Sequence, residues 1–114
     1  SLQETRAPGT FSEDDRRRYR RAWDRPGAFE AMVNWYRAIV RDRPHPATTR
    51  VEVPTLVIWG ARDQFLEKRL AGESVDYCVD GRLHTIDEAT HWVVHEYPPR
   101  VTKAIADHVD SVPL

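Results

Sequence analysis

The sequence predicts an α/β protein in which short parallel strands alternate with helices. Val53–Trp59 is a short apolar run, β-branched at several positions and closed by Gly60. Such a run is typical of a strand that is buried on both faces. Leu83–Ile86 is predicted as a second short strand, and a helical pattern follows each strand. The order strand–helix–strand–helix favours parallel pairing through right-handed crossovers.

Length and charge narrow the classes of function. The chain has 114 residues, which is enough for one modest domain with its own core. Its 17 basic and 18 acidic side chains nearly balance, so neither nucleic acid nor an anionic membrane is expected as a partner. No apolar run approaches the ~20 residues that span a bilayer. With a single cysteine, Cys78, we expect a soluble protein of the reducing cytoplasm, and we expect no cofactor.

The first helix is expected to begin after Ser12, whose side chain can cap it, with acidic residues in its first turn. Residues 16–21 include five arginines. This run can be an anion-binding patch, but the mixed charges favour a solvated helix face. Two ion pairs with a spacing of four residues would stabilise it: Glu13 with Arg17, and Asp14 with Arg18. Pro26 and Gly27 end the pattern.

Ala28–Asp42 gives the clearest helical pattern of the chain. Its apolar residues recur at intervals of three or four and form one stripe of a helix: Phe29, Met32, Val33, Tyr36 and Val40. Pro44 and Pro46 would stop this helix. The connection Pro44–Arg50 is therefore the best internal boundary, because two helices precede it and the alternating pattern follows it.

The strand Thr55–Trp59 starts after Pro54, which cannot donate to a sheet ladder and belongs at the start of a strand. The chain then reaches Asp63, just past the C-terminal end of the strand. A helix is expected from about Glu67 to Val79, with Gly81 where a C-terminal cap belongs.

The second strand, Leu83–Ile86, is followed by a predicted turn at Asp87–Thr90, which leads to His91. Pro98 and Pro99 open the last helix, in whose first turn proline is tolerated. The inner face of this helix would consist of Val101, Ala104, Ile105, His108 and Val109.

Asp63 and His91 are the candidates for catalysis. Ligands bind at the C-terminal ends of the strands in open α/β sheets, and each of these residues follows a strand directly. The carboxylate would orient the imidazole and stabilise its protonated form, while the imidazole acts as general base towards a nucleophile or water. Taken singly, Asp63 can be a turn aspartate bonded to its own backbone, and His91 a partly buried histidine. Their joint placement favours the catalytic pair.

Three stretches of the sequence resemble the α/β-hydrolase superfamily. Pro54–Leu66 is similar to the segment that carries the triad acid, and Ala89–Pro98 to the segment that carries the triad histidine. The stretch Asn34-Trp35-Tyr36-Arg37, with Trp23–Ala28 ahead of it, resembles a helix of the cap domain of epoxide hydrolases. The branch of epoxide hydrolases and haloacetate dehalogenases is the most similar, and the resemblance covers nearly the whole chain.

The resemblance implies a role for each matching residue. Asp63 would be the triad acid and His91 the base. Tyr36 would donate a hydrogen bond to the epoxide oxygen, or bind halide in a dehalogenase; alternatively, it packs in the core as part of the apolar stripe. Trp35 and Trp92 would bind substrate, although Trp92 can equally well only pack against its neighbours.

The resemblance also implies a domain organisation. Residues 1–10 would be a tail or linker, residues 11–46 the C-terminal helices of a cap domain, and residues 47–114 the C-terminal portion of the hydrolase core. The expected fold is thus the C-terminal part of an α/β-hydrolase, with the last two parallel strands and their flanking helices.

The nucleophile of such an enzyme is not found in this sequence. It would lie on an elbow of the form Gly-x-Ser-x-Gly or Gly-x-Asp-x-Gly, and no such elbow and no His-Gly oxyanion motif occurs. The chain by itself is therefore expected to be inactive and to need the N-terminal half of the hydrolase fold as its partner. Alone, its exposed sheet edge would invite self-association.

The leading function is the acid–base portion of an epoxide hydrolase, with an epoxide as the small organic substrate. The same portion would serve a haloacetate dehalogenase or an esterase. A different class is a non-catalytic binding or interaction module that lacks a nucleophile. A metal site is a third alternative, because His91 and His95 are four residues apart with Asp87 and Glu96 nearby. The His-Glu-x-x-His arrangement of zinc proteases is absent, however, and no metal is predicted.

Overall fold

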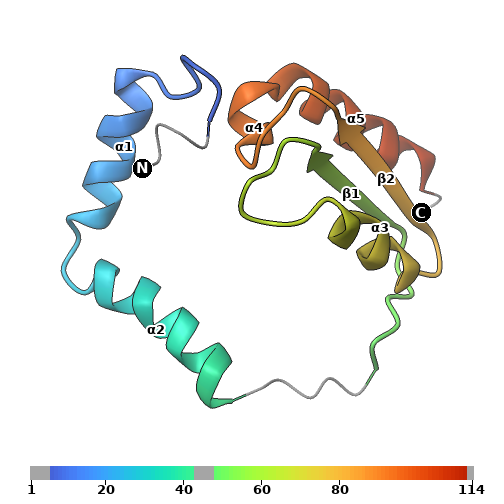
Figure 1. Ribbon diagram of the computed structural model, residues 1–114, viewed down its shortest axis with the longest axis horizontal. Coiled ribbons are helices and arrows are strands. Elements are labelled where there is room, and N and C mark those ends of the chain that lie inside the picture. Colours follow the sequence, from blue (N-terminus) through green and yellow to red (C-terminus); the bar gives the residue numbers. More distant parts are fainter. Residues whose placement is uncertain (1–5, 43–47, 113–114) are drawn as a thin grey trace. The chain divides into compact units, whose positions relative to one another are not determined.

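A computed structural model describes residues 6–42 and 48–112, which form two compact units. One unit contains residues 11–42, and the other contains residues 6–10 together with 48–112 (Figure 1). The prolines that were predicted to stop the second helix lie outside the described residues. None of the described helices is long and apolar enough to cross a membrane. The assignment of the units to a cap and a hydrolase core stays a prediction.

Helix α1, Glu13–Trp23, begins at a capping box. The Ser12 hydroxyl accepts a hydrogen bond from the Asp15 amide at 3.1 Å, and the Asp15 carboxylate accepts one from the Ser12 amide at 2.9 Å. These reciprocal bonds satisfy backbone donors that the first helical turn leaves free. The predicted cap at Ser12 is confirmed.

The arginines of α1 are exposed and form local ion pairs. Asp14 contacts Arg17 at 2.7 Å and Arg18 at 2.8 Å. The predicted pair of Glu13 with Arg17 is wrong, since Arg17 turns to Asp14, three residues away, and Glu13 lies 3.6 Å from Arg16. Positions three and four residues apart are both neighbours on a helix, so either pairing was sterically open. The pattern matches a solvated helix face.

Helix α2, Ala28–Arg41, follows Gly27, whose φ of 76° lies in the left-handed region that favours glycine. The predicted helix is confirmed, but it contains no buried residue. Its large apolar side chains are exposed: Phe29, Met32, Trp35, Tyr36, Ile39 and Val40. The stripe that the sequence predicts is therefore formed, and its apolar face is open.

The other unit is built on a two-stranded parallel sheet. Strand β1, Thr55–Gly60, pairs with strand β2, Gly81–Ile86, so that Thr55 lies opposite Gly81 and Gly60 opposite Ile86. A parallel bridge between Val51 and Cys78 extends the ladder. The predicted parallel pairing is confirmed, and both strands end at the same edge of the sheet.

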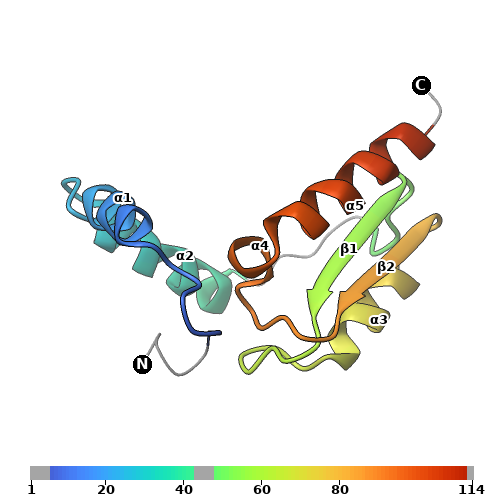
Figure 2. The ribbon, with the colours of Figure 1, turned by 90° about the horizontal axis from the view of Figure 1, so that it is seen from above.

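Helices cover both faces of this sheet. Helix α3, Arg69–Asp76, connects the strands, and helix α5, Pro98–Ser111, follows the short helix α4, Val93–Glu96. Figure 2 shows α3 and α5 on opposite sides of the two strands. Pro98 and Pro99 occupy the first positions of α5, as predicted. Helix α4 is not predicted from the sequence, and it is only four residues long.

Gly81 does not cap the helix before it, contrary to the prediction. Helix α3 ends earlier, at Asp76, with Tyr77 as its C-terminal cap. Gly81 instead begins β2, where an added Cβ would lie 2.8 Å from side-chain carbons of both Val75 and Cys78. It also lacks the positive φ of a C-terminal cap. Glycine is needed here because the strand starts directly against the end of α3.

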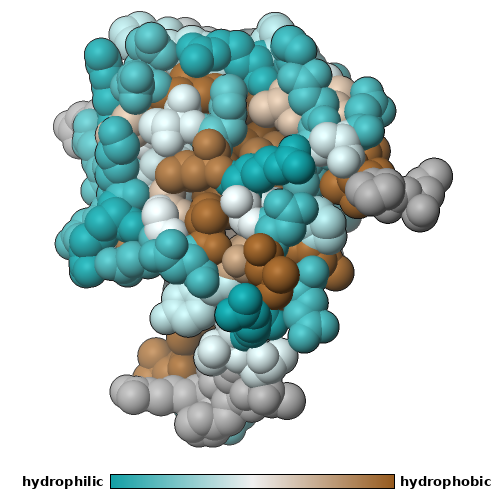
Figure 3. All heavy atoms as spheres, turned by 90° about the vertical axis from the view of Figure 1, so that its right-hand side faces the viewer, coloured by the Kyte–Doolittle hydropathy of each residue, from teal (hydrophilic) through white to brown (hydrophobic). Residues whose placement is uncertain are grey.

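The core of this unit is small. Ile86, Ala89 and Val101 are buried together, with Ile58, Val93 and Tyr97 packed against them. Other large apolar side chains stay exposed, including Leu83, Ile105 and Val109. Figure 3 shows apolar side chains between hydrophilic ones on the face that it views. The core joins β1 and β2 to the start of α5, just behind the ends of the strands.

Replacing Gly60 by alanine is expected to destabilise the protein. An added Cβ would overlap the Thr90 carbonyl oxygen and lie 2.7 Å from that of Ala89, and backbone atoms cannot rotate away. We expect a loss of roughly 1–3 kcal/mol in the free energy of unfolding, measured by denaturant titration of the intact protein.

The matched control is Gly72→Ala in α3, where an added Cβ meets nothing within 4 Å. Alanine has the higher helix propensity, so this variant should be as stable as the wild type or up to about 1 kcal/mol more stable. Equal effects of the two substitutions would contradict the close approach at Gly60.

Candidate active site

The loops that follow the two strands are joined backbone to backbone. The Ala61 amide donates to the Ile86 carbonyl at 3.0 Å, and the Arg62 amide donates to the Ala89 carbonyl at 2.9 Å. Gly60, at the end of β1, lies against the second loop with no room for a side chain. The residues just past each strand are therefore fixed relative to one another.

Asp63 uses both of its carboxylate oxygens. Oδ1 accepts hydrogen bonds from the amides of Phe65 at 2.8 Å and Leu66 at 3.1 Å, and Oδ2 lies 2.8 Å from Nδ1 of His91. The side chain is only 6% exposed. Asp63 is thus both a turn aspartate and the partner of His91, two roles that the sequence presents as alternatives.

The environment of Asp63 keeps its carboxylate charged. Burial raises the pKa of Asp63, but the hydrogen bonds from His91 and from the amides of Phe65 and Leu66 outweigh it, and the pKa lies below its ordinary value. A charged carboxylate at this position favours the tautomer of His91 that carries its proton on Nδ1.

The His91 ring is held on two sides and open on a third. The Phe65 ring contacts it edge-on at 5.0 Å between centroids, and the Trp92 ring does so at 5.6 Å. The side chain is 38% exposed. With Nδ1 bonded to Asp63, Nε2 has no hydrogen-bond partner among the described residues. This arrangement leaves one ring nitrogen free to take a proton from a bound molecule.

The remaining predicted site residues are divided between the two units. Trp92 packs between His91 and His95, with its ring centroid 6.5 Å from that of His95. Trp35 and Tyr36 lie on α2 and are 72% and 73% exposed. Within the described residues, Tyr36 is therefore not packed. Both residues belong to the helical unit, whereas His91 and Trp92 belong to the other unit.

Glu96 has a structural role that the sequence did not reveal. The sequence pattern suggests for it only a place beside the two histidines of a metal site. Within residues 6–42 and 48–112, no three His, Cys, Asp or Glu side chains gather so that they could hold a metal ion. The Glu96 carboxylate instead accepts hydrogen bonds from Ala7, Thr10 and Thr90. The available signal was its position close after His91.

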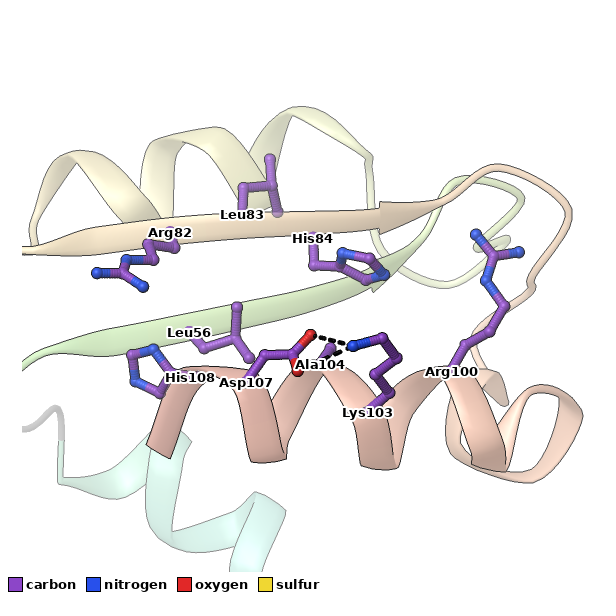
Figure 4. A pocket seen from close by; sticks show the side chains of 9 residues that line it. All are labelled: Leu56, Arg82, Leu83, His84, Arg100, Lys103, Ala104, Asp107 and His108. Atoms are coloured by element: carbon purple, nitrogen blue, oxygen red, sulfur yellow. Dashed lines mark hydrogen bonds and ion pairs between the residues drawn. The ribbon is translucent and has the colours of Figure 1, made fainter. Parts of the chain in front are cut away.

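A separate hollow of about 420 Å³ lies between the sheet and α5 (Figure 4). Neither Asp63 nor His91 lines it. Three of its basic side chains already have partners within the chain: Lys103 with Asp107, Arg100 with Glu88, and Arg82 with the Ser111 hydroxyl. This hollow is not part of the candidate active site.

No family model matches the chain. Among curated proteins, the AB hydrolase superfamily protein YfhM of Bacillus subtilis (strain 168) is 40% identical over 104 residues, which cover 91% of this chain and 36% of that protein. Epoxide hydrolase 2 of Caenorhabditis elegans is 32% identical over 92 residues, 80% of this chain and 26% of that protein.

The solved structures agree on the fold. A mutant epoxide hydrolase from Bacillus megaterium superposes with a TM-score of 0.77 at 21% identity, covering 90% of this chain and 39% of the other. The chain thus spans between about a quarter and two fifths of the lengths of these relatives.

Asp63→Asn tests the buried carboxylate. The folded pKa lies below the ordinary aspartate value of about 3.9, so the charge stabilises the fold above that value, and this gain is lost as pH falls through the folded pKa. The variant should lose roughly 1.5–3 kcal/mol at neutral pH and progressively less in acid, as measured by unfolding of the intact protein across pH.

Asp87→Asn is the control, because this exposed carboxylate makes no hydrogen bond with a described residue. A deficit of Asp63→Asn that stayed constant from neutral to strongly acid pH would contradict the assignment.

Proposed function

Because this chain belongs to the α/β-hydrolase superfamily and has the fold of its C-terminal part, we propose that it supplies the acid and the base of an epoxide hydrolase. The single observation that carries this proposal is the 2.8 Å contact between Oδ2 of Asp63 and Nδ1 of His91. The epoxide hydrolases among the similar proteins support the choice of substrate class.

The proposed reaction has two steps. In the first, a carboxylate nucleophile attacks one epoxide carbon, the bond from that carbon to the ring oxygen breaks, and an ester and an alkoxide form. This nucleophile would lie in a segment that corresponds to the part of the relatives not covered by the chain. The Tyr36 hydroxyl would donate its proton to the alkoxide. That role fits a tyrosine that is exposed on α2 rather than packed.

In the second step, Nε2 of His91 takes a proton from water, and the hydroxide attacks the ester carbonyl. The ester bond breaks and releases the diol, while the nucleophile returns as a carboxylate. The imidazolium then gives up its proton, and the Tyr36 phenolate regains one through solvent, so that both groups are restored. Asp63 holds the ring and stabilises the imidazolium that forms. Its lowered pKa suits this task, since the carboxylate stays charged throughout.

The partner of this chain would be the N-terminal half of the hydrolase fold. Two observations support it. In the described part of the chain, each of β1 and β2 has a neighbouring strand on one side only. The unpaired N–H and C=O groups of such an edge pair readily with another strand. The apolar face of α2 is exposed as well, and a face of this kind is typical of an interaction site or a pocket wall.

Trp35 and Trp92 are proposed as substrate-binding residues.

His91→Ala in the intact protein tests the proposed base. Because His91 acts only in the second step, the variant should still form the ester but hydrolyse it about 10²–10⁴-fold more slowly. Mass spectrometry after mixing with a small epoxide should then show an adduct that persists in the variant and turns over in the wild type.

His84→Ala is the control, because this histidine lines the separate hollow beside α5. Parallel assays with haloacids and esters identify the substrate class. Wild-type turnover by His91→Ala, or no hydrolysis of any of the three classes by the wild type, would overturn the proposed function.

Tyr36→Phe tests the proposed donor of a proton to the alkoxide. Loss of the hydroxyl leaves the developing alkoxide without its donor, so formation of the ester should slow roughly 10²-fold, whereas its hydrolysis stays unchanged. Stopped-flow measurement of the two steps separates these effects. Tyr77→Phe is the control, as Tyr77 is an exposed tyrosine of the other unit. Equal slowing of both steps would rule out the role of Tyr36.

A further inference from the structure

The Glu96 carboxylate joins two segments that are far apart in the sequence. Oε2 accepts a hydrogen bond from the Thr90 amide at 2.7 Å, and Oε1 accepts one from the Thr90 hydroxyl at 2.8 Å. Oε1 also accepts from the Ala7 amide at 2.8 Å and from the Thr10 hydroxyl at 3.3 Å. All four donors are neutral groups, so backbone and hydroxyl dipoles stabilise this charge.

The bonds to Thr90 fix the loop directly before His91. Thr90 is buried, with 8% of its surface exposed, and its carbonyl lies against Gly60 at the end of β1. Its hydroxyl also accepts a weak hydrogen bond from the Trp92 amide at 3.3 Å. The Glu96 side chain therefore holds Thr90, the residue before His91, in place.

The residue after His91 is held by main-chain hydrogen bonds of α4. The first turn of α4 closes through hydrogen bonds from the amides of His95 and Glu96 to the Trp92 carbonyl, at 2.8 Å and 3.0 Å. The backbone before His91 is thus bonded to the Glu96 carboxylate, and the backbone after it is bonded to the Glu96 main-chain amide. The Nδ1 contact with Asp63 depends on where this backbone holds the ring.

The other segment is an ordered turn. The Thr10 amide donates to the Ala7 carbonyl at 3.3 Å, and the Thr10 hydroxyl, whose single proton is shared with Glu96, donates to the same carbonyl at 2.6 Å. Pro8 and Gly9, with φ of 80° at the glycine, occupy the positions that a type II turn favours. This turn directly precedes Phe11, the first residue of the helical unit. The chain therefore enters that unit from a point anchored on Glu96.

We propose that Glu96 is a positioning residue that holds His91 in its working orientation and ties the turn at residues 7–10, which leads into the helical unit, to the loop that carries the base. This role rests on the proposed function. Burial raises the pKa of Glu96, but its hydrogen bonds from Ala7, Thr90 and Thr10 outweigh it and keep the pKa below its ordinary value. The carboxylate therefore remains charged wherever the imidazole can act as a base.

The test measures both reaction steps in the intact protein for Glu96→Ala and Glu96→Gln. A positioning role for His91 affects only hydrolysis of the ester, so Glu96→Ala should slow that step about 10–100-fold and change its formation less than twofold. Glutamine keeps one acceptor oxygen and should lie between alanine and the wild type. If the alanine variant fails to fold, slower hydrolysis of the ester by Glu96→Gln, with its formation unchanged, still tests the role.

Hydrogen exchange supplies a second measurement that does not depend on activity. The Thr90 and Ala7 amides donate directly to Glu96, so both should exchange at least tenfold faster in Glu96→Ala. Glu73→Gln is the control, because this exposed glutamate pairs only locally with Arg69 on α3; it should leave both steps and both amides unchanged.

Failure of this role and failure of the proposed function give different results. If His91→Ala traps the ester while the Glu96 variants hydrolyse it at the wild-type rate, the positioning role is overturned and the proposed function stands. The same holds if ester formation and hydrolysis fall by equal factors, which indicates a purely structural residue. If the wild type forms no ester and His91→Ala changes nothing, both are overturned.

Discussion

The contact between the end of β1 and the loop after β2 is the constraint on which the candidate site depends. Gly60 lies so close to the backbone of Ala89 and Thr90 that no side chain fits between them. This approach lets the Arg62 amide reach the Ala89 carbonyl, and it sets the distance between the positions of Asp63 and His91. A parallel sheet brings two strand ends to one edge, but the glycine brings them within the reach of a hydrogen bond.

Two carboxylates secure this edge in the same way. Asp63 and Glu96 each accept backbone N–H groups, and each also bonds a side chain at this edge. Asp63 contacts the His91 ring, and Glu96 accepts a hydrogen bond from the hydroxyl of Thr90, the residue before His91. Backbone donors cannot rotate away, so a carboxylate bonded to them has little freedom of its own. These bonds fix Asp63 and the loop before His91. The imidazole therefore has less conformational freedom to lose when it is oriented for a reaction.

Much of this arrangement could be predicted from the sequence, because its signals are local. The apolar run of β1, the pair of prolines at the start of α5 and the cap at Ser12 each act within a few residues. Parallel pairing then follows from the order of the elements, and it places Asp63 and His91 at one edge. The contact of Glu96 with Ala7 spans 89 positions, and no local pattern encodes it. Gly81 was misread because a glycine after a helix suggests a cap, whereas packing against Val75 and Cys78 decides its place.

Helix α2 shows the limit of periodicity most clearly. Its stripe identifies the helix and its apolar face, yet periodicity does not specify what covers that face, and in the described residues it is exposed. The sheet edges have the same property, since alternation and β-branching predict a strand but not both of its neighbours. Burying such surfaces is favourable by roughly 25 cal/mol per Å² of apolar area. The exposed face of α2 and the unpaired edges of the sheet therefore favour burial against further protein, which the proposed association with the remainder of a hydrolase fold would supply, and Asp63 and His91 lie at the end of the strands that such association would extend.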